Sequence, residues 1–124
     1  MENKKKIYVS DLMKRIIAVI RQEKFEDVKR ALLAADCEGM NVSEVKGRGR
    51  QLGIKESYRG SSYCIDLIPK TRIELIVNDE DLENILQVIE DSARTGEVGD
   101  GKIFVSDVME VIRIRTGERG SNAV

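Results

Sequence analysis

The chain has 124 residues, of which 41% are hydrophobic and 35% charged, the size and composition of one folded, soluble domain. Its 21 basic and 22 acidic residues leave a net charge of -1, which excludes the broad positive surface of a general nucleic-acid binder. Histidine is absent, so the usual general base and the commonest protein ligand for metals are missing.

The two cysteines, Cys37 and Cys64, are far apart and form no C-x-x-C motif. We interpret both as reduced thiols packed in the fold of an intracellular protein. No apolar run reaches the roughly 20 residues of a spanning helix, and the charged first residues lack the apolar stretch of a signal peptide. The sequence therefore predicts a cytoplasmic protein.

The first half of the chain predicts a strand, a helix and a second strand. Residues 15–21 contain five consecutive apolar positions, which is typical of a strand buried on both faces. Apolar residues then recur at helical spacing from Phe25 to Leu33, and Gly39 stands where the chain is expected to reverse. A second strand is expected near residues 40–45.

The second half repeats the pattern. A strand is expected at residues 72–77, followed by a helix that begins near Asp79 and ends before Gly96. Its buried stripe is predicted to comprise Leu82, Ile85, Leu86, Ile89 and Ala93. Two further β-prone runs follow, at residues 102–106 and 110–116.

This order predicts an α+β fold of the ferredoxin-like type, a double split βαβ in which both helices cover one face of an antiparallel sheet. The other face is left bare. Because residues 15–21 are apolar on that face too, we expect copies of the chain to associate and bury it.

Residues 46–65 interrupt the compact scheme, with four glycines and no sustained period. Long connections of this kind are usually functional or mobile, and an extended β-hairpin is the alternative. Residues 1–12 lie outside the repeat as an N-terminal extension that the sequence gives no role.

Residues 96–102 read G-x-x-x-x-G-K, superficially a Walker phosphate loop. A true Walker loop runs from strand to helix and continues with Ser or Thr, whereas this one runs from helix to strand and continues with Ile103. Its three glycines still allow backbone N–H groups to converge on an anion beside Lys102. A plain glycine-rich turn is the alternative.

Two more cationic stretches are candidates for anion binding. In a strand, Arg113 and Arg115 would point to the same side, where two guanidinium groups favour a polyphosphate. A charged edge strand that discourages aggregation is the alternative interpretation. The run Lys46-Gly-Arg-Gly-Arg-Gln51 interleaves glycines with cations and is a weak signal by itself.

Together these stretches resemble the nitrogen regulatory P-II signal-transduction family over residues 13–124. Lys46-Gly-Arg-Gly-Arg-Gln51 is similar to the base of that family's T loop (about 48–65), and Tyr58-Arg-Gly-Ser-Ser-Tyr63 to its apex. Residues 95–105 resemble the second signature, which contains the B loop (about 94–101). Ile112-Arg-Ile-Arg-Thr-Gly117 resembles the nucleotide clamp of the C-terminal segment, 112–124.

The resemblance implies a homotrimer that binds ATP or ADP in the clefts between neighbours, with 2-oxoglutarate as effector. Gln51 is then the side-chain ligand of a Mg²⁺ ion that the phosphates and 2-oxoglutarate complete to six oxygens, and Lys70 is the partner of the distal carboxylate. The full set of implied binding residues is Asn41, Gly47, Arg48, Gly49, Arg50, Gln51, Lys70, Ile76, Gly99, Asp100, Gly101, Lys102, Arg113, Ile114 and Arg115.

By the same resemblance, the protein is a regulator and not an enzyme. It would control an ammonium transporter or nitrogen-assimilation enzymes through its T loop, and it would meet the membrane only through such a transporter. Tyr63 and Ser61 match residues that some members carry modified. Leu52 and Ser62 depart from the family's pattern, which bears on the choice of partner.

Two other classes of function remain as alternatives. An RNA-binding module shares the ferredoxin-like topology but needs exposed aromatic residues on its middle strands, and only Phe104 lies on an expected strand. An ATPase would need a base beside the loop, which the spacing does not provide, although slow hydrolysis by water and magnesium needs no dedicated residue.

Overall fold

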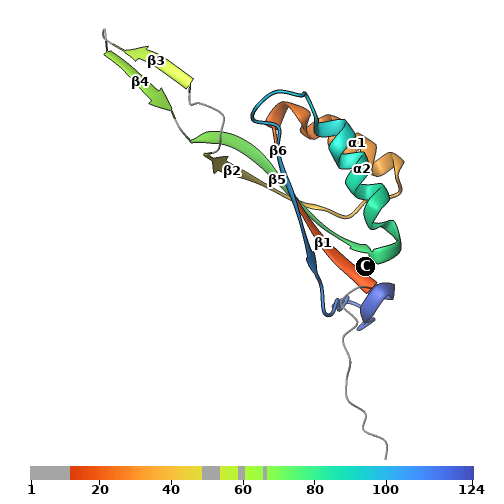
Figure 1. Cartoon of the computed structure of the whole chain (residues 1–124). Coiled ribbons are helices and arrows are strands. Elements are labelled where there is room, and N and C mark those ends of the chain that lie inside the picture. The colour runs from red at the N-terminus through yellow and green to blue at the C-terminus, as the bar shows by residue number, and fades with distance from the viewer. Residues whose placement is uncertain (1–11, 49–53, 59–60, 66) are drawn as a thin grey trace, which may run out of the picture.

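The computed structural model describes residues 12–48, 54–58, 61–65 and 67–124. Two helices lie across one face of a four-stranded antiparallel sheet (Figure 1). The strands of this sheet are β1 (Met13–Ile20), β2 (Asn41–Gly47), β5 (Ile68–Asn78) and β6 (Gly101–Asp107), in the spatial order β2-β5-β1-β6. The helices are α1 (Phe25–Ala34) and α2 (Leu82–Ala93). This arrangement confirms the predicted ferredoxin-like α+β fold.

The core lies between the sheet and the helices. Alternate residues of β1 and β5 point to the helices, and the apolar stripe of each helix faces them. The buried set is Ile16, Ala18, Ile20, Val28, Leu32, Ile73, Leu75, Val77, Ile85, Ile89 and Ala93. Full burial of an aliphatic side chain of this kind stabilises the fold by roughly 1.5–3 kcal/mol. Within the described ranges, no helix is both long and apolar enough to cross a membrane.

Helix α1 ends in a Schellman motif. The amide of Cys37 donates to the carbonyl of Leu32 (2.9 Å), and that of Asp36 donates to Leu33 (3.1 Å). Asp36 adopts the left-handed conformation, with φ of 62°. The expectation that Gly39 makes this reversal is wrong, because an aspartate tolerates the left-handed region well enough to end the helix three residues earlier.

Cys37 is a free, half-buried cysteine just beyond this cap. Removal from water raises the pKa of its thiol, and the nearby Asp81 carboxylate adds to the effect. An uncharged thiol that packs against the core agrees with the role predicted for it.

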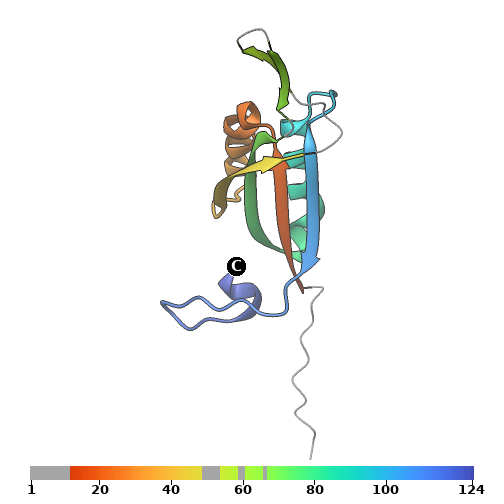
Figure 2. The ribbon, with the colours of Figure 1, turned by 90° about the vertical axis from the view of Figure 1, so that its left-hand side faces the viewer.

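The opposite face of the sheet carries no helix (Figure 2). Its apolar side chains on the three strands β1, β5 and β6 include Ile17, Val19, Ile68, Ile76 and Phe104. Beside them, Glu74 accepts hydrogen bonds from Arg15 (2.9 and 3.2 Å) and from Arg72 (2.9 Å). The face is therefore a mixture of apolar surface and a charged cluster. The association of copies through it stays a prediction.

Of the two alternatives for residues 46–65, the hairpin is the one observed where the backbone is described. Strands β3 (Ile54–Tyr58) and β4 (Ser61–Ile65) pair as an antiparallel hairpin that extends beyond β2 and β5 (Figure 1). The two candidate modification residues, Ser61 and Tyr63, both lie in β4. The N-terminal extension up to residue 11 lies outside the described residues.

The strand predicted at residues 110–116 is wrong. Only one isolated pair, Ile112 and Arg119, is bridged there, because the chain turns back on itself. The amide of Gly117 (φ 74°) donates to the carbonyl of Arg113 (2.7 Å), so the segment forms a tight hairpin of its own and does not join the sheet.

Candidate functional site

A cavity of about 670 Å³ opens at the end of the sheet where β1 stops and β6 starts. It is lined by Val19, Gly47, Arg48, Ile68, Lys70, Glu97, Val98, Gly99, Asp100, Gly101, Lys102 and Phe104. Seven of these belong to the set of binding residues that the family resemblance implied for nucleotide and 2-oxoglutarate, namely Gly47, Arg48, Lys70 and the run from Gly99 to Lys102. Three elements supply them: the end of β2, the start of β5, and the loop that leads into β6.

The loop before β6 depends on its glycines. Gly96, Gly99 and Gly101 have φ values of 91°, 107° and 100°, in the region that disfavours side chains. At Gly101 a side chain is also excluded by space, because a Cβ atom would lie 1.8 Å from the carbonyl oxygen of Val19. The loop can therefore lie close against the end of β1.

Asp100 holds this loop together from within. One carboxylate oxygen accepts the backbone amides of Thr95 (2.9 Å) and Gly96 (2.8 Å), and the other accepts the Thr95 hydroxyl and Arg21 Nε (2.9 Å). The Thr95 hydroxyl and then Arg21 are the largest causes that lower the pKa of Asp100 far below its usual range. The carboxylate therefore shapes the loop, because its oxygens are already engaged inside it.

Two cations lie beneath the loop. Arg21 Nη2 donates to the carbonyl of Val98 (2.8 Å), and the ammonium group of Lys70 donates to the carbonyl of Gly99. Lys70 is buried, and removal from water, followed by the nearby Arg21 charge, lowers its pKa. The sequence interpretation missed Arg21, whose only signal was its position directly after the first strand.

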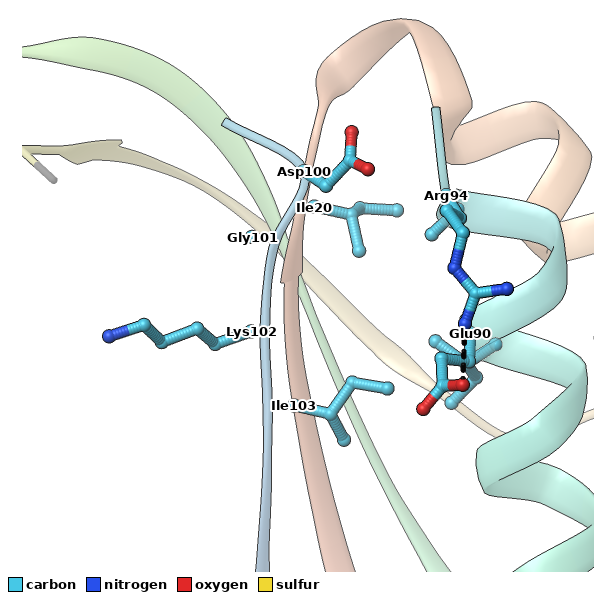
Figure 3. Close-up of a pocket in the computed structure, with 9 residues that line it drawn as sticks. Ile20, Glu90, Arg94, Asp100, Gly101, Lys102 and Ile103 are labelled. Carbon is cyan, nitrogen blue, oxygen red and sulfur yellow. Dashed lines mark hydrogen bonds and ion pairs between the residues drawn. The ribbon is translucent and has the colours of Figure 1, made fainter. Parts of the chain in front are cut away.

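Lys102 and Ile103 point to opposite sides of β6 (Figure 3). Ile103 turns toward α2, into a smaller cavity of about 330 Å³ whose rim carries an ion pair between Arg94 and Glu90 (2.7 Å). Lys102 turns away from the helices, to the side of the larger cavity. In the described part of the chain no carboxylate pairs with Lys102.

The cavity therefore suits an anion. Its lining carries the side chains of Arg48, Lys70 and Lys102, and the amides of Gly99 and Asp100 have no hydrogen-bond partner among the residues that the structure describes. Cationic side chains and converging amides are the groups that bind phosphate and carboxylate. No cluster of metal-binding side chains was found among the described residues.

The structure separates the remaining candidates from this cavity. Asn41 and Ile76 lie farther along the open face, Asn41 opposite Glu74 on β5. The segment with Arg113, Ile114 and Arg115 follows the far end of β6, near the start of β1 (Figure 1). Gly49, Arg50 and Gln51, and with Gln51 the predicted magnesium ligand, lie outside the described residues.

Within the C-terminal hairpin, the two arginines differ, since Arg113 is half-buried and Arg115 is exposed. Arg113 Nη1 donates to Glu118 (2.8 Å), which also accepts the Thr116 hydroxyl (2.8 Å). Ile114 is 97% exposed at the tip, an unusual position for a large aliphatic side chain. The tip is therefore a surface that nothing in the described part of its own chain covers.

Known proteins similar to this chain share one family name. Residues 13–118 match the family model described as "Nitrogen regulatory protein P-II". The P-II 2 and P-II 1 proteins of Methanothermobacter thermautotrophicus are 64% and 59% identical over 112 residues, which is 90% of this chain and 97% of each relative. The P-II protein of Rhizobium meliloti is 49% identical over 90% of this chain and all of that relative.

Among solved structures, "Arabidopsis thaliana PII bound to citrate" superposes with a TM-score of 0.75 at 35% sequence identity, over 91% of this chain and 92% of that one. The relatives are named as regulatory proteins and not as enzymes. The match of family model, sequence and fold leads to one conclusion: the chain belongs to the nitrogen regulatory protein P-II family.

Proposed function

We propose that the protein is a cytoplasmic signal-transduction regulator that binds ATP or ADP with 2-oxoglutarate and controls proteins of nitrogen metabolism through its T loop. One observation carries the proposal. The loop from Gly99 to Lys102 and the base of the T loop, Gly47 and Arg48, line the same cavity. An anion bound there touches the segment that would act on the target.

A nucleotide polyphosphate suits the charge of this cavity. Lys102 offers a point charge on a long side chain, and the amides of Gly99 and Asp100 offer backbone donors. Asp100 does not oppose the phosphates, because its own oxygens are turned into the loop. The Arabidopsis PII protein is bound to citrate in its solved structure, which supports a site for small anions in this fold.

The second half of the site would come from a neighbouring copy. Arg113 and Arg115 follow the far end of β6, so one chain does not bring them to its own Lys102 (Figure 1). A closed homotrimer that buries the apolar part of the open face would place the exposed tip at Ile114 against the adjacent subunit's cavity. Asn41 and Ile76 would then face the base and ribose.

Magnesium and 2-oxoglutarate fit the same proposal. The described lining offers no free carboxylate cluster, so phosphate and effector oxygens, with Gln51, would supply most of the six ligands that Mg²⁺ requires. Lys70 is the buried cation nearest the T-loop base that could neutralise the distal carboxylate. ADP, without a γ-phosphate, would not support the same ion, so the T loop would respond to both ligands.

Titration calorimetry tests the proposal on the full chain. We expect heat with ATP and with ADP, and heat with 2-oxoglutarate only when ATP and Mg²⁺ are present. Lys102→Ala should weaken ATP binding roughly 10- to 100-fold, because a hydrogen bond to a charged group contributes roughly 1.5–3 kcal/mol.

Lys29→Ala is the matched control for charge. Lys29 lies on the outer surface of α1, paired with Glu26 (3.1 Å) and remote from the cavity. Its loss changes the net charge equally and should leave ATP affinity unchanged. If neither ATP nor ADP gave heat, the proposal would be refuted. If Lys102→Ala and Lys29→Ala lost ATP affinity equally, Lys102 would not belong to the site.

A further inference from the structure

Beneath the phosphate-type loop, the guanidinium group of Arg21 bridges two of the loop's residues. Arg21 directly follows β1, and its side chain is only 16% exposed. Nε donates to Asp100 (2.9 Å) and Nη2 donates to the carbonyl of Val98 (2.8 Å). A planar guanidinium with donors in fixed directions sets the relative position of two acceptors, which a lysine ammonium does not do.

The bridge determines where the loop's amides point. A trans peptide is planar, with its N–H opposite its C=O, so a carbonyl drawn to one side turns the next residue's N–H to the other. Arg21 donates a hydrogen bond to the Val98 carbonyl, and Lys70 donates one to the Gly99 carbonyl. The amides of Gly99 and Asp100 therefore point away from these two cations.

Those two amides, like that of Val98 before them, have no partner inside the loop. Neither N–H has a hydrogen-bond partner among the described residues, although both residues line the cavity. By contrast, the amides of Thr95 and Gly96, at the start of the same loop, are satisfied by Asp100. Unpaired backbone donors are costly unless water or a ligand accepts them. The loop is thus held with two donors available for an anion.

We propose that Arg21 is a positioning residue of the nucleotide site: acting through Asp100 and the Val98 carbonyl, it sets the Gly99 and Asp100 amides to receive a phosphate. This inference rests on the proposed function and adds a residue to it. Arg21 need not touch the nucleotide. Its third nitrogen, Nη1, forms an ion pair with Glu23 at 3.6 Å.

The test is a double-mutant cycle read by ATP titration of the full chain, with Arg21→Ala, Asp100→Asn and the double variant. We expect each single variant to lose about tenfold in ATP affinity and the double variant to lose little more, since both break one bridge. Arg30→Ala, on the exposed outer side of α1, is the control for charge and should bind as the original chain does.

Two results would overturn the inference. Arg21→Ala binding ATP within about twofold of the original chain would show that the bridge is not needed. Losses that multiply in the double variant would show that Arg21 acts on the nucleotide independently of Asp100. Failure of the original chain to bind ATP at all would instead refute the proposed function.

If Arg21→Ala does not fold, Arg21→Lys decides. This variant keeps the positive charge but loses the planar set of guanidinium donors. We therefore expect a native thermal unfolding curve, together with weaker ATP binding and displaced amide resonances of Gly99 and Asp100. Unchanged affinity and unchanged amide resonances in Arg21→Lys would contradict the positioning role.

Discussion

The carbonyl oxygen of Val19 occupies the place that a side chain on Gly101 would need. A Cβ atom at Gly101 would lie 1.8 Å from that oxygen, and the backbone φ there is 100°. The end of β1 therefore lies against the backbone of Gly101, at the junction between the loop that carries Asp100 and the strand that carries Lys102. The geometry of the candidate site thus depends on the absence of a Cβ atom at residue 101.

Gly101→Ala should therefore destabilise the fold and weaken ATP binding. We expect a loss of roughly 2–4 kcal/mol, the sum of backbone strain and overpacking, measured by urea unfolding. Gly117→Ala is the matched control, because Gly117 also has a positive φ (74°) but an added Cβ would meet nothing within 4 Å. Equal losses in the two variants would show that the contact with Val19 is unimportant.

Asp36→Gly should stabilise the protein. Asp36 is exposed and adopts φ of 62° at the end of α1, where glycine carries no steric penalty. We expect a gain of roughly 0.5–1 kcal/mol, seen as a higher thermal unfolding midpoint. Asp36→Ala should give no gain, because alanine keeps the Cβ atom. A midpoint that rises equally for alanine would mean that the charge of Asp36, and not its conformation, matters.

Asp100 should make stability depend on pH in the acid range. Its pKa is lowered in the folded state, mainly by Thr95 and Arg21, so the folded protein holds the carboxylate ionised more strongly than the unfolded chain does. The resulting stabilisation is complete above the unfolded pKa of about 4 and is lost as the pH falls toward the lower folded value.

The measurement compares the original chain with Asp100→Asn in thermal unfolding from pH 7 to pH 3. We expect the variant to unfold at a lower temperature at pH 7, and the difference between the two midpoints to shrink below about pH 4. A constant difference over the whole range would show that ionisation of Asp100 does not contribute.

The periodic parts of the fold could be predicted from the sequence. The apolar run of β1 and the helical stripes of α1 and α2 bury large areas, and burial of this kind overrides local detail. The strand predicted at residues 110–116 failed because its apolar residues, such as Ile114, remain exposed at a hairpin tip. Periodicity indicates what could be buried, but not whether a partner surface exists within the same chain.

Sequence motifs predicted several residues of the site, but not the contacts that hold them in place. The glycines and Lys102 are recognisable in sequence, and the structure places them in one cavity with Lys70. Arg21 was not recognisable, because it is 79 residues from Asp100 and belongs to no motif. A bridge of that kind follows from the pairing of β1 with β6, which only the folded chain reveals.

In the proposed trimer, Lys102 of one copy and Arg115 of a neighbour complete a single nucleotide site. Co-expression of Lys102→Ala chains with Arg115→Ala chains distinguishes such a shared site from a site within one chain. Each variant alone should bind ATP poorly, whereas random mixing should restore about a quarter of the clefts, those with Lys102 from one chain type and Arg115 from the other. We expect high-affinity ATP binding by mixed oligomers in titration calorimetry. Mixed oligomers that bind ATP no better than the two variants alone would contradict a site shared between neighbouring copies.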